Sequence, residues 1–198
     1  MHTLVVVAHP TPGSLTHSLA KSIVGTLSSS KTKHTVDLLD LYAENFNPLF
    51  SDRDMATYRK EAEPPADVIA QQKRIEAAQS LVLVFPIHWW GMPAVLKGWV
   101  DRVFTNGWAF DWSPETGAQK KLKGLEVHVL CIGGASSGTY VRHGYEASIK
   151  KIIGEGLFDY TGASVGSFHV VGDSESPEKN ADIMEKAGTL SRLILDQS

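Results

Sequence analysis

Apolar residues along the chain fall into short continuous runs that alternate with longer stretches of helical spacing. The runs rich in β-branched and aliphatic residues are 3–9, 34–40, 80–86, 125–133 and 162–171. The first and third of them are apolar at nearly every position, as expected of parallel strands that are covered on both faces. The pattern therefore predicts five strands in one parallel sheet.

Between these runs, apolar residues recur every three or four positions, as they do in amphipathic helices. The first helix carries leucine or isoleucine at every fourth position from 15 to 27, and Ser14 is a suitable N-cap. Further helices are predicted over residues 66–79, 94–105, 140–154 and 177–195. The alternation predicts one α/β domain over residues 1–198, a three-layer sandwich whose five-stranded parallel sheet has the order 2-1-3-4-5.

Two long segments, residues 41–63 and 105–122, show no clear period and are predicted to be irregular. Loops of that length in a compact domain are usually functional or mobile.

Composition narrows the classes of partner. The formal charge of −3 gives no basic excess, so nucleic acid is not expected as the main partner. The one cysteine, Cys131, excludes an internal disulfide and a multi-cysteine metal site, and it suits a reducing cytoplasmic location. The amino terminus reads as a strand and not as a signal peptide. No apolar run approaches the roughly 18 residues that span a bilayer, so membrane insertion is not expected.

Ligands of doubly wound sheets bind beyond the carboxyl ends of the strands, so the loops there are the candidate site. The first loop, "HPTPGSLTHS" (9–18), is rich in hydroxyls and leads into a helix, whose amino terminus attracts anions. It has neither G-x-G-x-x-G nor a Walker lysine. We expect it to bind a phosphate through His9 and Ser14; in the alternative interpretation Ser14 only caps the helix and His9 is a satisfied strand-end residue.

The second loop, after residues 80–86, places Trp89 and Trp90 on a turn. Aromatic walls beside free backbone groups suit a flat heteroaromatic ligand. The alternative is that one tryptophan packs on the following helix.

The third loop, "GGASSGTYVRHGY" (133–145), allows close backbone approach at two glycines and offers Tyr140, His143 and Tyr145 as proton donors. It also contains G-x-S-x-G at 134–138, the nucleophile pattern of α/β hydrolases, with Asp159 and His169 following in the right order. A serine hydrolase using Ser136 is therefore an alternative function.

The stretch "PIHWWGMPAVLKGWVDRVF" (86–104) resembles the P-x-x-W-x-G-x-P-A-x-L-K-G-W-x-x-R-V-F signature of the NAD(P)H:quinone oxidoreductases of the DT-diaphorase-like family. Residues 40–54, "DLYAENFNPLFSDRD", are similar to that family's segment after strand two. The resemblance implies a flavodoxin-like fold, a flavin cofactor (FAD or FMN), NAD(P)H as cosubstrate and small quinone-like acceptors. It also implies two-electron transfer with ping-pong kinetics in a homodimer.

The resemblance also implies roles for particular residues. Those that match flavin-binding positions are His9, Leu15, Thr16, Pro86, Ile87, His88, Trp89, Trp90, Cys131, Ile132, Gly133, Gly134 and Tyr140. Phe110 and Trp112 match residues that line the quinone and nicotinamide pocket. At the position of the family's catalytic histidine this chain has Glu146, so we expect Tyr140, with His143 or Tyr145 as its partner, to stabilise charge on the reduced ring.

Aromatic residues in the two irregular segments favour the homodimer. Trp108, Phe110 and Trp112 lie in one short loop, and the segment 41–63 is similarly apolar. Exposed apolar patches usually mark association surfaces, although both loops could instead fold back on their own subunit. Because some relatives of the family serve as ancillary proteins of a glutathione-gated potassium efflux system, a regulatory subunit is a further alternative.

Overall fold

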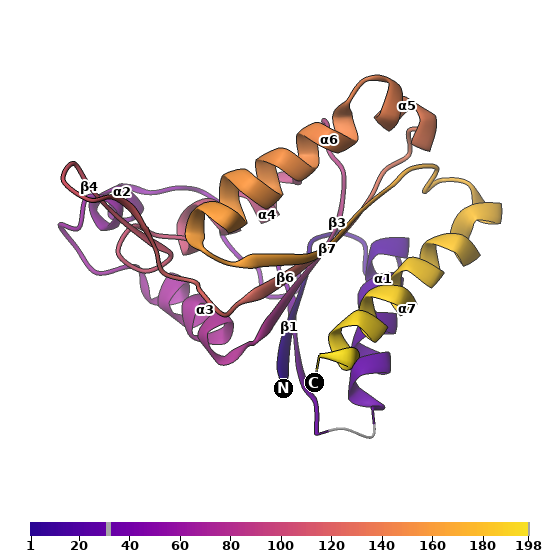
Figure 1. The fold of residues 1–198 in the computed structure, drawn as a ribbon, viewed down its shortest axis with the longest axis horizontal. Helices are drawn as coiled ribbons and strands as arrows, with labels where there is room; N and C mark the ends of the chain where they lie inside the picture. Colours follow the sequence, from indigo (N-terminus) through magenta and orange to yellow (C-terminus); the bar gives the residue numbers. More distant parts are fainter. Residues whose placement is uncertain (31–32, 198) are drawn as a thin grey trace.

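The computed structural model describes residues 1–30 and 33–197, and its centre is a five-stranded parallel sheet (Figure 1). The sheet runs in the order β2-β1-β3-β6-β7, which confirms the predicted order 2-1-3-4-5. All its neighbouring strands are parallel. The strands are β1 (His2–Val7), β2 (Thr35–Asp40), β3 (Ser80–Pro86), β6 (Glu126–Ile132) and β7 (Ser164–Val171).

Helices cover both faces of this sheet. On one face α1 (Leu15–Ser28) and α7 (Asn180–Asp196) lie side by side, and on the other lie α3 (Ala66–Ala77), α4 (Ala94–Val103) and α6 (Tyr145–Lys150). Alternate residues of β3 point into the two apolar cores, which is why its sequence is apolar throughout. No helix in residues 1–30 or 33–197 is long and apolar enough to cross a bilayer.

The helix predicted over residues 140–154 is longer and is built of three parts. It begins with α5 (Ser137–Arg142), turns at Gly144, where φ is +69°, and resumes as α6. It then continues as a π-helix, η1 (Lys151–Asp159). A short 3₁₀ turn, η2 (Pro177–Lys179), likewise precedes α7 in the last predicted helix.

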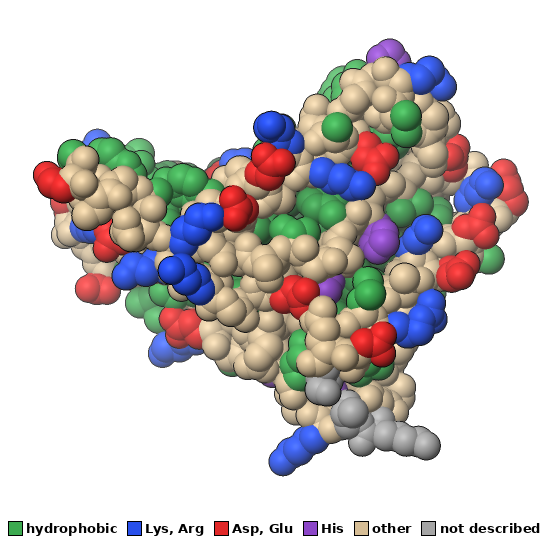
Figure 2. Space-filling view, viewed as in Figure 1, with side chains coloured by type: hydrophobic (Ala, Val, Ile, Leu, Met, Phe, Trp, Pro, Cys, Tyr) green, Lys and Arg blue, Asp and Glu red, His purple; other side chains and the backbone are tan. Residues whose placement is uncertain are grey.

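Both segments predicted as irregular contain regular structure. Residues 41–63 include α2 (Asp52–Tyr58), and residues 105–122 include the antiparallel hairpin of β4 (Phe110–Ser113) and β5 (Gly117–Lys120). An ion pair between Lys60 and Asp111 joins the turn after α2 to the hairpin. Figure 2 shows hydrophobic side chains gathered over this end of the molecule. Its exposed members, which we call the apolar end, are Leu49, Phe50, Met55, Tyr58 and Trp112.

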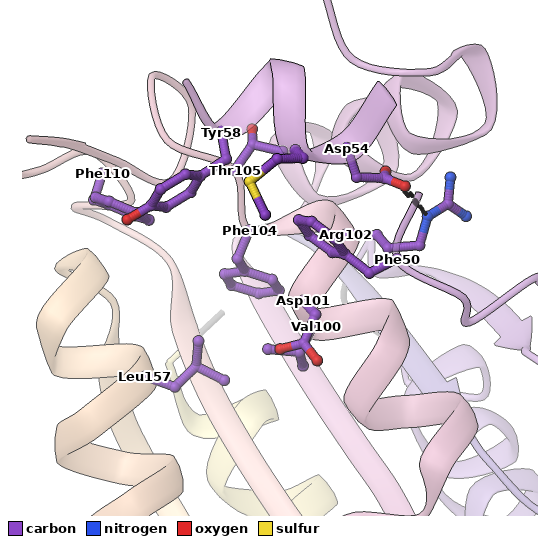
Figure 3. Close-up of a pocket in the computed structure, with 11 residues that line it drawn as sticks. Phe50, Asp54, Tyr58, Val100, Asp101, Arg102, Phe104, Thr105, Phe110 and Leu157 are labelled. Carbon is purple, nitrogen blue, oxygen red and sulfur yellow. Dashed lines mark hydrogen bonds and ion pairs between the residues drawn. The ribbon is translucent and has the colours of Figure 1, made fainter. Parts of the chain in front are cut away.

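A buried arginine ties these segments to the sandwich. Arg102 of α4 is only 5% exposed, and its Nε donates to Asp54 Oδ1 of α2 at 3.1 Å (Figure 3). Its Nη1 donates to Asp67 Oδ2 of α3 at 2.7 Å and to the carbonyl of Asn47 at 2.8 Å. The hydrogen bond from Arg102 lowers the pKa of the Asp67 carboxyl. Since a buried charge is tolerated only when it is paired, Arg102 fixes the positions of α2, α3 and the loop before α2.

The same loop touches the backbone of α4 at Gly98. A Cβ atom at this glycine would lie 2.3 Å from the carbonyl oxygen of Pro48. The contact therefore requires a residue without a side chain in the middle of a helix, where glycine is otherwise unfavourable.

We expect Gly98→Ala to lower the free energy of unfolding by about 1–3 kcal/mol or more, because the added methyl must displace the Pro48 backbone. Gly25→Ala is the matched control, since Gly25 is exposed in α1 with nothing within 4 Å of a Cβ. There alanine should raise stability by up to about 1 kcal/mol. Urea denaturation of both variants tests this, and equal effects of the two changes would refute the close contact.

Candidate functional site

The candidate site lies where the carboxyl ends of β1, β3 and β6 meet. β1 and β3 are neighbours in the sheet, but the helices that follow them, α1 and α4, cover opposite faces. Such a topological switch point is where open α/β sheets bind their ligands, and FMN binds there in flavodoxin-like folds. The three loops predicted to carry the chemistry all leave the same edge of the sheet.

In the first loop, Ser14 caps α1 and accepts a hydrogen bond from the His17 backbone N–H at 3.3 Å. The His17 ring bridges two further groups: its Nδ1 lies 3.0 Å from Ser14 Oγ and its Nε2 lies 2.9 Å from Asp40 Oδ2. Sequence reasoning did not single out His17 or Asp40. The signal was available, because His17 follows the cap by three residues and Asp40 ends β2, the strand beside β1.

The other predicted residues of this loop differ in accessibility. His9 is half-buried, and its Nδ1 accepts from the Thr11 N–H at 3.0 Å, so the neutral ring carries its proton on Nε2. Burial, together with the nearby rings of His17 and His88, lowers the pKa of His9 despite the bond from Thr11. Leu15 is half-buried against the core beneath α1, and Thr16 is fully buried. A ligand here would therefore meet mainly backbone amides, Ser14 and His9.

The turn after β3 is tight and strained. His88 and Gly91 exchange backbone hydrogen bonds of 3.1 and 3.0 Å, and the two residues between them have positive φ, +47° for Trp89 and +62° for Trp90. This is the backbone of a type I′ turn, which favours glycine or asparagine. Bulky residues held in left-handed conformations cluster at functional sites. Ile87 anchors the turn by donating to the Ile132 carbonyl at 2.7 Å.

The side chains of the two tryptophans differ in exposure and in their ring contacts. Trp89 is 95% exposed. Trp90 stacks on Tyr145, with ring centroids 3.8 Å apart and planes 14° from parallel, and meets the edge of Tyr140 at 5.6 Å. His143 also stacks on Tyr145, with ring centroids 5.4 Å apart. The helix that receives Trp90 is thus the one after β6, and Trp89 is left free to contact a ligand or a second chain.

Tyr140 lies at the centre of the site. A Cβ at Gly133 would fall 1.9 Å from the Tyr140 hydroxyl oxygen and 3.5 Å from Ile87 Cβ, so the hydroxyl sits over Gly133 beside the end of β3. Burial, and next the nearby Cys131, raise the pKa of Tyr140. The hydroxyl therefore stays protonated and can donate at neutral pH. Gly134 is exposed and faces the Glu175 carboxylate. A Cβ added at Gly134 would lie 2.9 Å from Glu175 Oε1.

Several predicted residues can contribute only their backbone. Cys131 and Ile132 are buried at the end of β6, and the Cys131 thiol donates to the His169 carbonyl at 3.4 Å. Burial raises the pKa of that thiol far above its ordinary value, so it is not a reactive group. Pro86 ends β3 and His88 is exposed on the turn.

Two cavities lie along α4. One of about 470 Å³ is lined by Trp89 and Trp90, and another of about 400 Å³ is lined by Phe110 and by three members of the apolar end, Phe50, Met55 and Tyr58 (Figure 3). They share Val100, Asp101 and Leu157. Within one chain, Phe110 therefore lines the neighbouring cavity, and Trp112 lines neither of the two.

The residues of the alternative hydrolase are not assembled. Ser136 Oγ lies 3.0 Å from Thr139 Oγ1, and Asp159 pairs with Lys120 at 2.8 Å. Nε2 of His169 is buried without a hydrogen-bond partner among the described residues. No nucleophile–base hydrogen bond supports this function.

Comparison with known proteins identifies the family. The model of a family described as having a flavodoxin-like fold matches residues 1–194, and the chain belongs to that family. An uncharacterized NAD(P)H oxidoreductase of Haemophilus influenzae is 29% identical over 176 residues, which cover 87% of this chain and 84% of the relative. Ribosyldihydronicotinamide dehydrogenase [quinone] of Mus musculus is 31% identical, with 74% of this chain and 69% of the relative covered.

Solved structures agree on the fold. An NAD(P)H:quinone oxidoreductase from Methanothermobacter marburgensis superposes with a TM-score of 0.87 at 24% identity, covering 98% of this chain and 96% of that one. The general stress protein 14 of Treponema denticola, solved in complex with FMN, has a TM-score of 0.68 at 25% identity, with 98% and 99% covered. The expected resemblance and the flavodoxin-like fold are both confirmed.

The two tryptophans give a direct test of the turn. Trp90→Ala should lower the free energy of unfolding by about 1–3 kcal/mol, because it removes two aromatic contacts and leaves a gap beside Tyr140. Trp89→Ala should change it by less than about 0.5 kcal/mol, as expected of an exposed side chain. Denaturant unfolding of the cofactor-free variants measures both, and a large loss at Trp89 would contradict this placement.

Proposed function

We propose that the chain is a flavin-dependent NAD(P)H:quinone oxidoreductase that reduces small quinone-like acceptors by two electrons. The observation that carries the proposal is the arrangement of three loops at the switch point of a flavodoxin-like sheet, with aromatic residues, free amides and a buried tyrosine at one edge. The names of the quinone-reducing relatives support it. We further propose that residues 1–198 act as one cytoplasmic domain.

The residues present fit a flavin. The first turn of α1, with Ser14 and the Nε2–H of His9, supplies donors for the cofactor's phosphate. The amides of Trp89 and Trp90 make no hydrogen bond within the described chain and can pair with the edge of the ring system. On the other side, Gly133 leaves room for the Tyr140 hydroxyl and Gly134 leaves room for the Glu175 carboxylate. Phosphate, ring and ring edge thus each find a matching group.

Bound flavin supplies the two-electron chemistry that links oxidation of NAD(P)H to reduction of the acceptor. The chain's own residues position the reactants and stabilise charge. With flavin bound, Tyr140 would donate a hydrogen bond to the ring edge from a hydroxyl that is already buried, so little reorganisation would be needed to stabilise negative charge there. The exposed Trp89 and the 470 Å³ cavity beside it offer one face to NAD(P)H and acceptor in turn, as ping-pong kinetics requires.

The contacts of His143 favour a positioning role over direct contact with the reactants. It is exposed and stacks on Tyr145, the ring on which Trp90 also stacks. We propose that Tyr145 and His143 act through this stack, by holding Trp90 and Tyr140 in place.

The first experiment measures flavin binding and turnover. Purified protein should bind FMN or FAD and oxidise NAD(P)H continuously only when a quinone is supplied. Tyr140→Phe should keep the flavin but slow its reduction about ten- to hundredfold in stopped-flow measurements, because one donor to developing charge is lost. Tyr42→Phe, which removes an exposed hydroxyl, is the control. A colourless protein that gains no flavin would refute the function; unchanged reduction in Tyr140→Phe would exclude only that residue's role.

We also propose a homodimer in which a second copy completes the pocket. Phe110 and Trp112 match substrate-lining residues, yet in one chain they lie outside the cavity beside Trp89. The apolar end exposes five large side chains on α2, β4 and the loop before α2, and an apolar patch of this kind marks an association surface. A two-fold arrangement would bring this end of each copy to the site of the other.

Light scattering should therefore give a mass about twice the 21.6 kDa of the chain. Phe50→Glu should shift the protein to monomers and lower quinone reduction, because it places a charge in the apolar end. Leu193→Glu is the control, since that side chain is exposed on α7 at the other face of the sheet. A fully active monomer would overturn the shared pocket.

A further inference from the structure

Three side chains from three elements form a hydrogen-bonded chain beside the candidate phosphate site. Asp40 at the end of β2 contacts His17 in the first turn of α1, and His17 contacts Ser14 before that helix. The His17 side chain is buried and that of Asp40 is mostly so. The inference drawn from this chain rests on the proposed flavin-binding function.

The Asp40 carboxylate determines which nitrogen of the neutral His17 ring carries the hydrogen. Its Oδ1 accepts from the Tyr42 and Ala43 N–H groups, both at 3.1 Å, while Oδ2 faces His17 Nε2. Burial opposes ionisation of Asp40, but the hydrogen bonds from His17 and from the two amides outweigh it and lower the pKa of the carboxyl. An ionised carboxylate only accepts, so Nε2 of His17 must carry a hydrogen.

Whether Nδ1 of His17 carries a hydrogen decides whether the Ser14 hydroxyl can donate its proton to a ligand. A serine hydroxyl has one proton to donate and two lone pairs. Ser14 Oγ already accepts from the His17 N–H. When the ring is neutral, Nδ1 has no hydrogen and takes the hydroxyl proton. When the ring is protonated, Nδ1 donates to the oxygen instead, and the hydroxyl proton is free to point away.

We infer that binding of the flavin phosphate is coupled to uptake of a proton by His17, which turns the Ser14 hydroxyl toward the phosphate. His17 and Asp40 are positioning residues in this arrangement, since Ser14 makes the contact. The phosphate favours the imidazolium through its charge as well as through the hydroxyl. By linkage, the proton must strengthen phosphate binding by the factor by which phosphate strengthens proton binding.

Asp40 is the charged group hydrogen-bonded to His17. The His9 ring stands edge-on to His17 at 6.2 Å, and His88 is also near His9. Burial lowers the pKa of His9, so His9 is mainly neutral at pH 7 before a ligand binds. α7 packs on α1 through apolar side chains, among them Ile183, Ala187 and Leu190.

Calorimetry in buffers of different ionisation enthalpy tests the coupling. Above about pH 7 the FMN phosphate already holds its second charge, so proton exchange there reports the protein. We expect FMN binding to be accompanied by measurable proton uptake at pH 8, and the FMN dissociation constant to rise with pH between pH 7.5 and 8.5, by no more than about tenfold per pH unit. Riboflavin, which lacks the phosphate, should bind without proton uptake.

Variants distinguish loss of this proton coupling from general loss of the flavin site. His17→Asn should abolish both the uptake and the pH slope, and Asp40→Asn should reduce them, while riboflavin binding shows that each variant retains its site. His2→Asn, at the opposite end of β1, should behave as wild type. Wild-type binding of FMN without proton uptake, or unchanged uptake in His17→Asn, would overturn the inference alone. Failure to bind FMN, FAD or riboflavin would overturn the proposed function with it.

Discussion

The ion pairs of Arg102 are the interaction on which the arrangement of this molecule depends. One guanidinium reaches Asp54 in α2, Asp67 in α3 and the Asn47 carbonyl. Its carbon also stands 5.3 Å from the centre of the Phe46 ring. Because removing one partner would leave a buried charge unpaired, the network acts as a unit. The network holds the irregular loop before α2 against α4, the helix that begins after the tryptophan turn. The apolar end and the candidate site are therefore both positioned by α4.

Sequence periodicity was enough to predict the sheet and its covering helices, because each strand and helix buries a face that repeats along the chain. It could not find α2 or the β4–β5 hairpin. These elements are too short to show a period, and they are held by partners far away in sequence, such as Arg102 for Asp54 and Lys60 for Asp111. The break at Gly144, where φ is +69°, lies inside a run of helical spacing, and the glycine itself was the local signal for it.

The candidate site was likewise predictable from the sequence only in part. The three loops were predicted from their places after the strands, and Tyr140 from the resemblance. The Asp40–His17 contact joins residues 23 positions apart on neighbouring elements, and only register in the sheet brings them together. Nor could the sequence distinguish Trp89 from Trp90. The positive φ of both residues turns one ring onto Tyr145 and the other into solvent. A strained turn is thus the means by which two adjacent identical residues acquire different surroundings.

The π-helix η1 sets a limit on how this part of the chain can vary in length. Ile149 in α6 and the buried residues Ile153 and Phe158 of η1 are four and then five positions apart, a spacing that a wider helix aligns on one side. Loss of one residue without a change of helix type would rotate everything beyond it by roughly a quarter of a turn. Phe158 would then leave its contact with Phe104, whose centroid lies 6.0 Å away at the end of α4. The residue count between α6 and β7 is therefore coupled to the type of helix there, although nothing in the composition of the stretch shows this coupling.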